Sequence, residues 1–190
     1  MAQNSTHQIT GKKVAFLATG GVEQSELTEP WKAVQEAGGQ PVLVSPAEGK
    51  ITALQHDWDH GDSFDVDVPL AQARAEDYDA LVLPGGAINA DKMRAEAAAV
   101  DFVKAFAEAG KPISAICHAP WTLIEAGLAK GRRMTSYSSL QTDLRNAGAD
   151  WVDEQVVTDR GLTTSRNPGD LDAFCAKMLE EISEGRHDEL

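Results

Sequence analysis

The stretch KPISAICHAPW, from Lys111 to Trp121, has the pattern of a strand that turns sharply into a helix. Its first part is a short, mostly apolar run after a basic residue, as in a buried strand of a parallel sheet. Pro120 suits the first turn of a helix, where its missing N–H costs nothing. The sequence therefore predicts a strand over Lys111–Ile116, a turn at Cys117 and a helix after it.

Similar runs lie on both sides of this unit. Further strands are expected at Lys12–Thr19, Pro41–Ser45, Asp79–Leu83 and Arg132–Tyr137, and helices at Gln24–Ala37, Asp91–Ala109, His118–Ala129, Ser138–Ala147 and Pro168–Ile182. Strands alternating with helices across short, Gly-containing joints predict a three-layer α/β sandwich with a mostly parallel sheet. Residues 51–70 and 152–164 alternate in polarity, so we expect them to be antiparallel additions at the sheet edges.

Composition limits the function classes. The chain has 190 residues and a net charge of -13, with no basic cluster, which argues against nucleic acid and anionic membranes as partners. We expect one domain over residues 1–190, with a flexible segment at residues 1–11 and an acidic tail at residues 183–190. Two cysteines cannot make a disulfide framework, and we find no membrane span or secretory signal, so we expect a reducing, cytoplasmic location.

Ligands of parallel α/β sheets bind beyond the carboxyl ends of the strands. Here that rule selects Thr19–Glu26, Pro84–Asp91 and Cys117–Pro120. In the last of these, alanines lie two residues before and two after Cys117, a spacing that parallels the nucleophile elbow of hydrolases. The helix that follows would stabilise a thiolate, whereas Cys175 falls within a helical pattern and reads as a packed side chain.

The other two stretches supply candidate partners for the cysteine. Gly85 and Gly86 could offer amides to an oxyanion, or form a plain tight turn. Glu23 could face the same crevice, or be a solvated acid at a helix start. His118 follows Cys117 directly, and because adjacent residues rarely point the same way, the sequence does not decide whether the two touch.

Five motifs carry a family resemblance: TGGVEQSEL, DALVLPGG, AICHAP, AGADWVDEQVV and TSRNPGDLDAF. In this order and at these spacings, from Lys12 to about Leu179, the chain resembles the ThiJ/PfpI superfamily, in its PfpI branch of intracellular proteases and general stress proteins. The resemblance implies a flavodoxin-like sandwich with the topology of class I glutamine amidotransferases. It also implies a homodimer or a dimer-based oligomer.

Matched residue by residue, the resemblance implies that Cys117 is the reactive cysteine, Glu23 the acid that hydrogen-bonds its sulfur, and His118 the histidine of the branch's CH pair. The branch takes a third acid from a neighbouring subunit, and Asp91 is its nearest counterpart. This chain departs from the pattern with Ala119 in place of glycine and with an aspartate, after a one-residue insertion, in place of glutamate.

Two other sites are disfavoured. A glutaminase needs a histidine on a later strand, and after His118 the chain has only His187, in its tail. A metal site is conceivable in the stretch QHDWDHGDS, but a solvated polar loop is favoured, so we expect neither metal nor cofactor.

Two functions remain open. The first is a stress-response cysteine hydrolase, a peptidase or a deglycase or glyoxalase-like enzyme, that acts on a small molecule or a peptide. The second is a redox-responsive stress protein whose cysteine is oxidised to sulfenic or sulfinic acid with little turnover.

Overall fold

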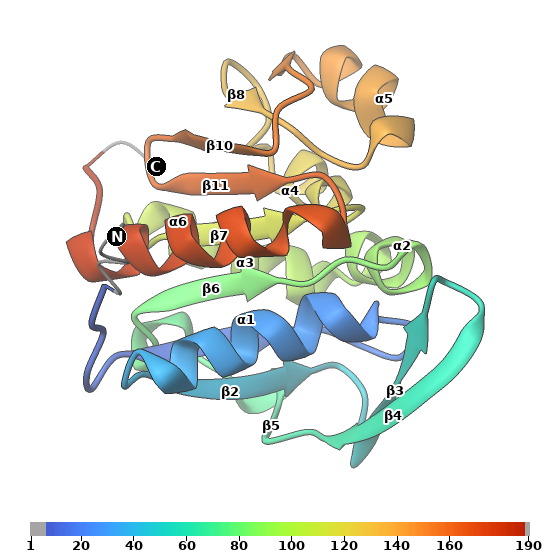
Figure 1. Ribbon diagram of the computed structural model, residues 1–190, viewed down its shortest axis with the longest axis vertical. Coiled ribbons are helices and arrows are strands. Elements are labelled where there is room, and N and C mark those ends of the chain that lie inside the picture. Colours follow the sequence, from blue (N-terminus) through green and yellow to red (C-terminus); the bar gives the residue numbers. More distant parts are fainter. Residues whose placement is uncertain (1–6, 189–190) are drawn as a thin grey trace, which may run out of the picture.

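The computed structural model describes residues 7–188 and shows a seven-stranded sheet between layers of helices (Figure 1). The strand order is β10-β11-β7-β6-β1-β2-β5, and every neighbouring pair is parallel except β10 and β11. The strands are β1 (Lys13–Leu17), β2 (Gln40–Ser45), β5 (Val68–Pro69), β6 (Ala80–Leu83), β7 (Ile113–Ile116), β10 (Val156–Asp159) and β11 (Leu162–Ser165). The three-layer α/β sandwich with a mostly parallel sheet is confirmed.

Two apolar clusters hold the helices against the sheet. On one face lie α1 (Gln24–Glu36) and α6 (Leu171–Glu184), side by side in Figure 1. The other cluster packs side chains of α2 (Ala87–Ala95), α3 (Ala97–Glu108), α4 (Pro120–Glu125) and α5 (Gln141–Asn146). In the described part of the chain, no helix is long and apolar enough to cross a membrane.

The strand expected at Arg132–Tyr137 is present only in part and lies outside the main sheet. Residues 133–134 form β8 (Arg133–Met134), which pairs with β9 (Asp150–Trp151) in a separate two-stranded sheet. The place beside β7 is taken by β11, which is parallel to it, so that only β10 is an antiparallel addition at this edge. Local polarity cannot reveal this exchange, because both segments have strand-like composition and the choice depends on packing across the sheet.

Residues 51–70 contain the expected antiparallel strands, but these strands do not lie at the edge of the main sheet. Strands β3 (Lys50–Gln55) and β4 (Asp59–Asp65) form an antiparallel hairpin of their own, while β5 adds to the main sheet in parallel with β2. The hairpin rises beside the carboxyl ends of the strands, and its tip approaches α2 (Figure 1). The expected helix over Asp91–Ala109 is two helices, because Glu96 has an extended backbone.

Both chain ends are attached where the structure describes them. Ile9 is buried, and its amide donates to the carbonyl of Ala37, so the expected free segment does not extend to this residue. In the acidic tail, the amide of His187 donates to the carbonyl of Gly110 at 2.7 Å. Residues 1–6 and 189–190 of these predicted segments lie outside the described residues.

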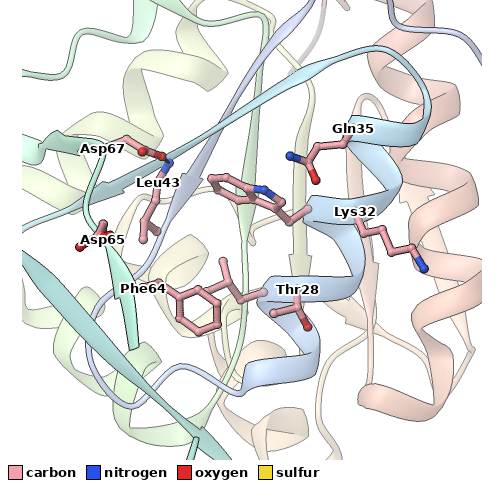
Figure 2. Close-up of a pocket in the computed structure, with 9 residues that line it drawn as sticks. Thr28, Lys32, Gln35, Leu43, Phe64, Asp65 and Asp67 are labelled. Atoms are coloured by element: carbon pink, nitrogen blue, oxygen red, sulfur yellow. Dashed lines mark hydrogen bonds between the residues drawn. The ribbon is translucent and has the colours of Figure 1, made fainter. Parts of the chain in front are cut away.

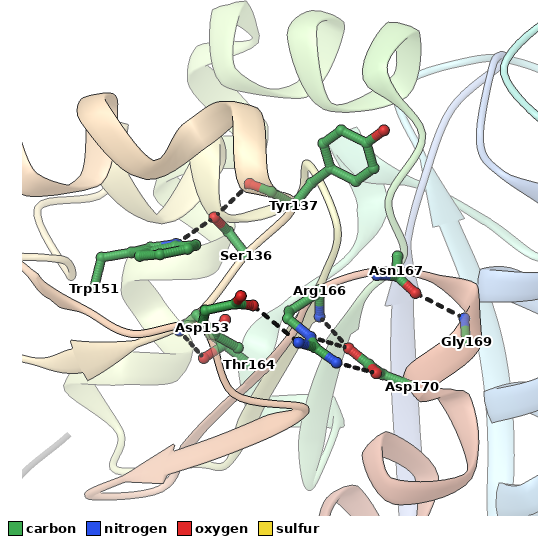
Figure 3. Close-up of polar contacts among 10 residues, drawn as sticks. Ser136, Tyr137, Trp151, Asp153, Thr164, Arg166, Asn167, Gly169 and Asp170 are labelled. Atoms are coloured by element: carbon green, nitrogen blue, oxygen red, sulfur yellow. Dashed lines mark hydrogen bonds and ion pairs between the residues drawn. The ribbon is translucent and has the colours of Figure 1, made fainter.

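An arginine fixes the junction between β11 and α6. The guanidinium of Arg166 donates to both carboxylate oxygens of Asp170, at 2.8 and 3.0 Å, and to Asp153 at 2.9 Å (Figure 3). Asp170 is buried at the start of α6. Because the carbonyl of Ser165 accepts the Cys117 amide, this junction also anchors the strand end that supports the elbow.

Candidate active site

Cys117 lies at a strained turn at the end of β7. Its backbone is left-handed, with φ of 64°, a conformation that costs a non-glycine residue about 1–2 kcal/mol. Three backbone hydrogen bonds hold the turn: Cys117 N–H to Ser165, Ala119 N–H to Ile116, and Tyr137 N–H to the Cys117 carbonyl. The strain is thus maintained by neighbouring elements, as is common at functional sites.

The imidazole of His118 faces the cysteine sulfur. Nδ1 of His118 lies 3.1 Å from Sγ of Cys117, which answers the question that the sequence left open. The ring stacks on Tyr137 with centroids 4.6 Å apart and meets Trp121 edge-on at 5.2 Å, while Nε2 lies 3.5 Å from the hydroxyl of Ser139. Two aromatic rings therefore fix the imidazole in the orientation that brings it to the sulfur.

The carboxyl beside the sulfur belongs to Glu26, and the placement of Glu23 there was wrong. Glu26 lies in the first turn of α1 and is fully buried. A Cβ atom on Gly85 would meet a Glu26 oxygen and lie 2.6 Å from Cys117 Cβ, so the two side chains converge on this glycine. Within the described residues, neither Glu26 oxygen has a partner at full hydrogen-bond geometry.

Glu23 is turned away because it precedes the helix. It is the N-cap of α1, and its carboxylate accepts the backbone amides of His56 and Asp57, at the hairpin tip, at 3.2 and 3.3 Å. Glu26, one turn later, shares the buried helix face with Pro30 and Val34. The sequence did contain a signal for Glu26: it is an acid at helical spacing from the apolar residues that form the buried face of α1.

Burial sets the charge of the site. It raises the pKa of Glu26 from 4.5 to about 8, helped by the charge of Glu23 and opposed by the Cys117 thiol and the Gly85 amide. Burial is the main cause that raises the pKa of Cys117, and the charge of Glu26 adds to it. The Gly86 amide opposes this rise. Burial lowers the pKa of His118. The resting site near neutral pH is therefore a thiol, a neutral imidazole and a mostly protonated carboxyl.

The glycine pair has the freedom that this arrangement needs. Gly86 has φ of 89°, and a Cβ there would lie 2.6 Å from the Glu23 nitrogen. The buried amide of Asn89 donates to the carbonyls of Pro84 and Gly85 at 3.0 Å. Its oxygen accepts the amide of Thr19 at 2.8 Å. The ends of β1 and β6 are thereby tied together beside the elbow.

Asp91 lies exposed on α2, on the surface of the chain. Asp57 accepts the amide of Ala87 at 3.1 Å, and its charge raises the pKa of Cys117 and opposes the lowering of the pKa of His118. Sequence reasoning had placed Asp57 in a solvated loop, and only the hairpin contact across 30 residues reveals it.

Two other features lie apart from the elbow. A cavity of about 380 Å³ separates α1 from β2 and the end of β4, with Leu43 and Phe64 facing the helix (Figure 2). Among the described residues, a group of possible metal ligands, Glu181, Glu184 and His187, has its ligand atoms within 4.8 Å of one another at the end of α6. None of these residues belongs to the cysteine site.

The comparisons with known proteins decide the family. The model of the DJ-1/PfpI family matches residues 12–181, nearly the whole chain. This chain belongs to the DJ-1/PfpI family. The predicted ThiJ/PfpI relationship is therefore confirmed.

Relatives of the PfpI type are similar over most of their length. YraA of Bacillus subtilis, whose name marks it as a candidate cysteine protease, is 42% identical over 88% of this chain and 96% of its own. Deglycase TK1284 of Thermococcus kodakarensis is 39% identical over 88% and 98%. General stress protein 18 of Bacillus subtilis is 41% identical over 89% and 96%.

The fold agrees with solved members of the DJ-1/PfpI family. Drosophila melanogaster DJ-1beta superposes with a TM-score of 0.81 and 30% identity, over 90% of each chain. The chain is thus a DJ-1/PfpI protein whose relatives are named as stress proteins, deglycases or a candidate protease.

Proposed function

We propose that this protein is a cysteine-dependent hydrolase in which Sγ of Cys117 attacks the carbon of a carbonyl group or of its amine adduct. The observation that carries the proposal is the 3.1 Å contact between Sγ and Nδ1 of His118 at a strained strand end. The neutral imidazole can take the thiol proton as the sulfur attacks and later return it to the leaving group. Protonated Glu26 donates to the sulfur when the sulfur carries charge.

The oxygen of the attacked carbonyl needs a stabilising donor. The amide of Gly86 opposes the rise that burial causes in the pKa of the Cys117 thiol. We assign this amide, with that of Gly85, to the negative charge that develops during attack. A side chain on Gly85 would clash with Cys117 and Glu26, and one on Gly86 would clash with the backbone of residues 21–23.

We favour a small carbonyl compound or a glycated amine over a peptide. Cys117 is only 4% exposed, and a buried sulfur is easier to reach for a small electrophile than for an extended chain. The deglycase name of the Thermococcus relative supports this substrate class, and the protease-type name of YraA supports the peptide. We further propose a cytoplasmic location, since both cysteines are free, and a dimer in which Asp91 approaches the partner's site.

The test compares three substrates: methylglyoxal, a methylglyoxal-modified amine and a fluorogenic peptide. We expect turnover of the small substrates by the wild type and by Cys175→Ser, and loss of turnover in Cys117→Ser. Cleavage of the peptide alone, dependent on Cys117, would transfer the proposal to a peptidase. Equal turnover by wild type and Cys117→Ser would overturn the role of Cys117 as the nucleophile. For assembly, sedimentation at micromolar concentration should show no dominant monomer.

Cysteine oxidation is the alternative that one observation supports. The Glu26 carboxyl has no hydrogen-bond partner at full geometry among the described residues and lies beside the sulfur, so it could donate to an oxygen added there. One peroxide molecule would convert the thiol to sulfenic acid and water, and a second would give sulfinic acid. Stoichiometric gain of two oxygens by Cys117, without turnover of any substrate, would favour this function.

A further inference from the structure

The tip of the β3–β4 hairpin holds two strained residues in succession. His56 and Asp57 have φ of 56° and 63°, in the left-handed region that few residues other than glycine adopt. Their consecutive amides both donate to the carboxylate of Glu23, at 3.2 and 3.3 Å. Successive N–H groups of this kind form a concave binding site for an anion. Glu23 therefore supplies the contact that offsets the strain of the tip.

The conformation of the tip places the Asp57 side chain at the start of α2. One carboxylate oxygen of Asp57 accepts the amide of Ala87 at 3.1 Å. The helix has Gly86 at its N-cap and thus no side chain of its own there, so Asp57 caps it from a distant element. The partial positive charge of a helix N-terminus favours an ionised carboxylate. Two residues before Ala87, Gly85 packs against Cys117, because a Cβ atom on Gly85 would lie 2.6 Å from Cys117 Cβ. The sulfur of Cys117 in turn lies 3.1 Å from Nδ1 of His118.

From this geometry we propose that Asp57 is the acid of its own chain that stabilises His118 when the imidazole is protonated during catalysis, and that Glu23 is the residue that positions Asp57. The inference rests on the function proposed above, because the neutral His118 ring becomes a positively charged imidazolium when it takes the thiol proton of Cys117. It gives the chain an internal acid in addition to any contribution of a partner's Asp91.

The effect operates through charge. Asp57 opposes the fall that burial causes in the pKa of His118, and it also raises the pKa of Cys117. While the sulfur is a thiolate, the two effects oppose each other. Once the sulfur has bonded to carbon it is neutral, and the negative charge lies on the carbonyl oxygen that the glycine amides are proposed to hold. The imidazolium is then the positive charge that Asp57 can stabilise. Asp57 therefore acts after attack rather than in the resting enzyme.

The neighbours of His118 allow this effect to be isolated. In the described part of the chain, the imidazole contacts Cys117 Sγ, the Trp121 and Tyr137 rings and the Ser139 hydroxyl. Asp57 acts on its pKa through charge. Capping Cys117 with iodoacetamide replaces the S–H proton by a carboxamidomethyl group. The product has a neutral sulfur, like the proposed covalent intermediate, and the carboxylates remain as the charged groups nearby.

The experiment measures the pKa of His118 by NMR in the capped full-length protein, as wild type, Asp57→Asn, Glu23→Gln and Asp59→Asn. The Asp57→Asn side chain would keep an oxygen for the Ala87 amide while losing the charge. Asp59→Asn makes the same charge change on exposed β4 and is the matched control. We expect Asp57→Asn to lower the pKa by about half a unit or more, Glu23→Gln to lower it less, and Asp59→Asn to leave it unchanged.

A shift in Asp57→Asn no larger than that in Asp59→Asn would overturn the role of Asp57. Unchanged amide signals of His56 and Asp57 in Glu23→Gln, with an unchanged His118 pKa, would overturn the role of Glu23. The Ala87 amide signal reports whether the Asp57→Asn protein keeps the cap. Because the readout needs no turnover, a shift without activity on any substrate would reject the hydrolase and not the electrostatic role of Asp57.

Discussion

Cys117 combines a reactive side chain with a backbone that suits glycine. Its φ of 64° is held by backbone hydrogen bonds to Ser165 and Tyr137. The small neighbours Ala115 and Ala119 are both buried, so the strand and the helix can close around the turn. The strained backbone of Cys117 therefore positions the sulfur and lowers the stability of the folded protein, as is common at functional sites.

The strain predicts an unusual order of stabilities. Replacing cysteine by glycine at position 117 should give a protein about 1 kcal/mol more stable than replacing it by alanine, because glycine relaxes the left-handed backbone. Urea unfolding of the two variants measures the difference. Ala115→Gly, in the middle of β7, is the control and should be less stable than wild type. A Cys117→Gly protein less stable than Cys117→Ala would show that the turn is not strained.

Glu26 should make stability depend on pH. Its folded pKa of about 8 lies above its ordinary value of 4.5, so the folded state binds the proton more tightly than the unfolded chain does. The stabilisation is fully present below 4.5 and is lost as the pH rises through about 8. Relative to Glu26→Gln, the wild type should lose up to about 1.4 kcal/mol of unfolding free energy per pH unit in that window.

Denaturant titrations between pH 4.5 and 8 test this window. Exposed Glu29, on the same helix, provides the matched control, and Glu29→Gln should follow the wild type at every pH. A constant difference between wild type and Glu26→Gln would mean that the buried carboxyl titrates normally.

Sequence could predict some of these residues and not others. Cys117 was predicted because its small flanks, strand end and following proline are all local features. Glu26 was missed because Glu23 matched the expected distance from the strand, although Glu26 shares the buried face of α1 with Pro30. Asp57 was missed because its contact with Ala87 depends on how the hairpin folds over the sheet edge, which no local pattern records.

At the scale of elements, the joint between β11 and α6 holds the strand that supports the elbow. Asp170→Asn should destabilise the protein by about 1.5–3 kcal/mol, because a buried carboxylate then stops pairing with Arg166. Asp153→Asn removes another contact of the same guanidinium (Figure 3), but the Asp153 side chain is 71% exposed, so we expect a loss below about 1 kcal/mol.

Thermal or urea unfolding of the two variants gives the comparison. Equal losses in the two proteins would contradict the importance that we give to the buried pair.

The elements also show where prediction from sequence ends. The central strands β1, β6 and β7 were predicted because each is a short, mostly apolar run. The segment of β11 was expected to be an antiparallel edge addition and is instead the parallel neighbour of β7, while the expected strand at Arg132–Tyr137 stays outside the main sheet. Which of them joins the sheet is decided by long-range packing, and that information is spread over the whole chain.

For the molecule as a whole, the parallel sheet brings distant segments to one place. The carboxyl ends of β1, β6 and β7 are adjacent in the strand order, so the loops after them meet at Cys117. The hairpin adds a fourth segment through Glu23 and Asp57. The three strand ends could be predicted from the regular alternation of strand and helix. The antiparallel pairing of the hairpin was also predicted, but its position over the site was not, because the hairpin lies outside the main sheet.

The most direct test of the cysteine site is the rate at which iodoacetamide alkylates Cys117 at neutral pH, in wild type and in His118→Asn. The imidazole at 3.1 Å should accept the thiol proton during attack, so we predict a fall of about tenfold or more in the variant. Cys175, whose pKa burial raises to about 12, is the internal control and should react slowly and equally in both proteins. An unchanged rate at Cys117 in His118→Asn would contradict the role of His118 as the base that accepts the thiol proton.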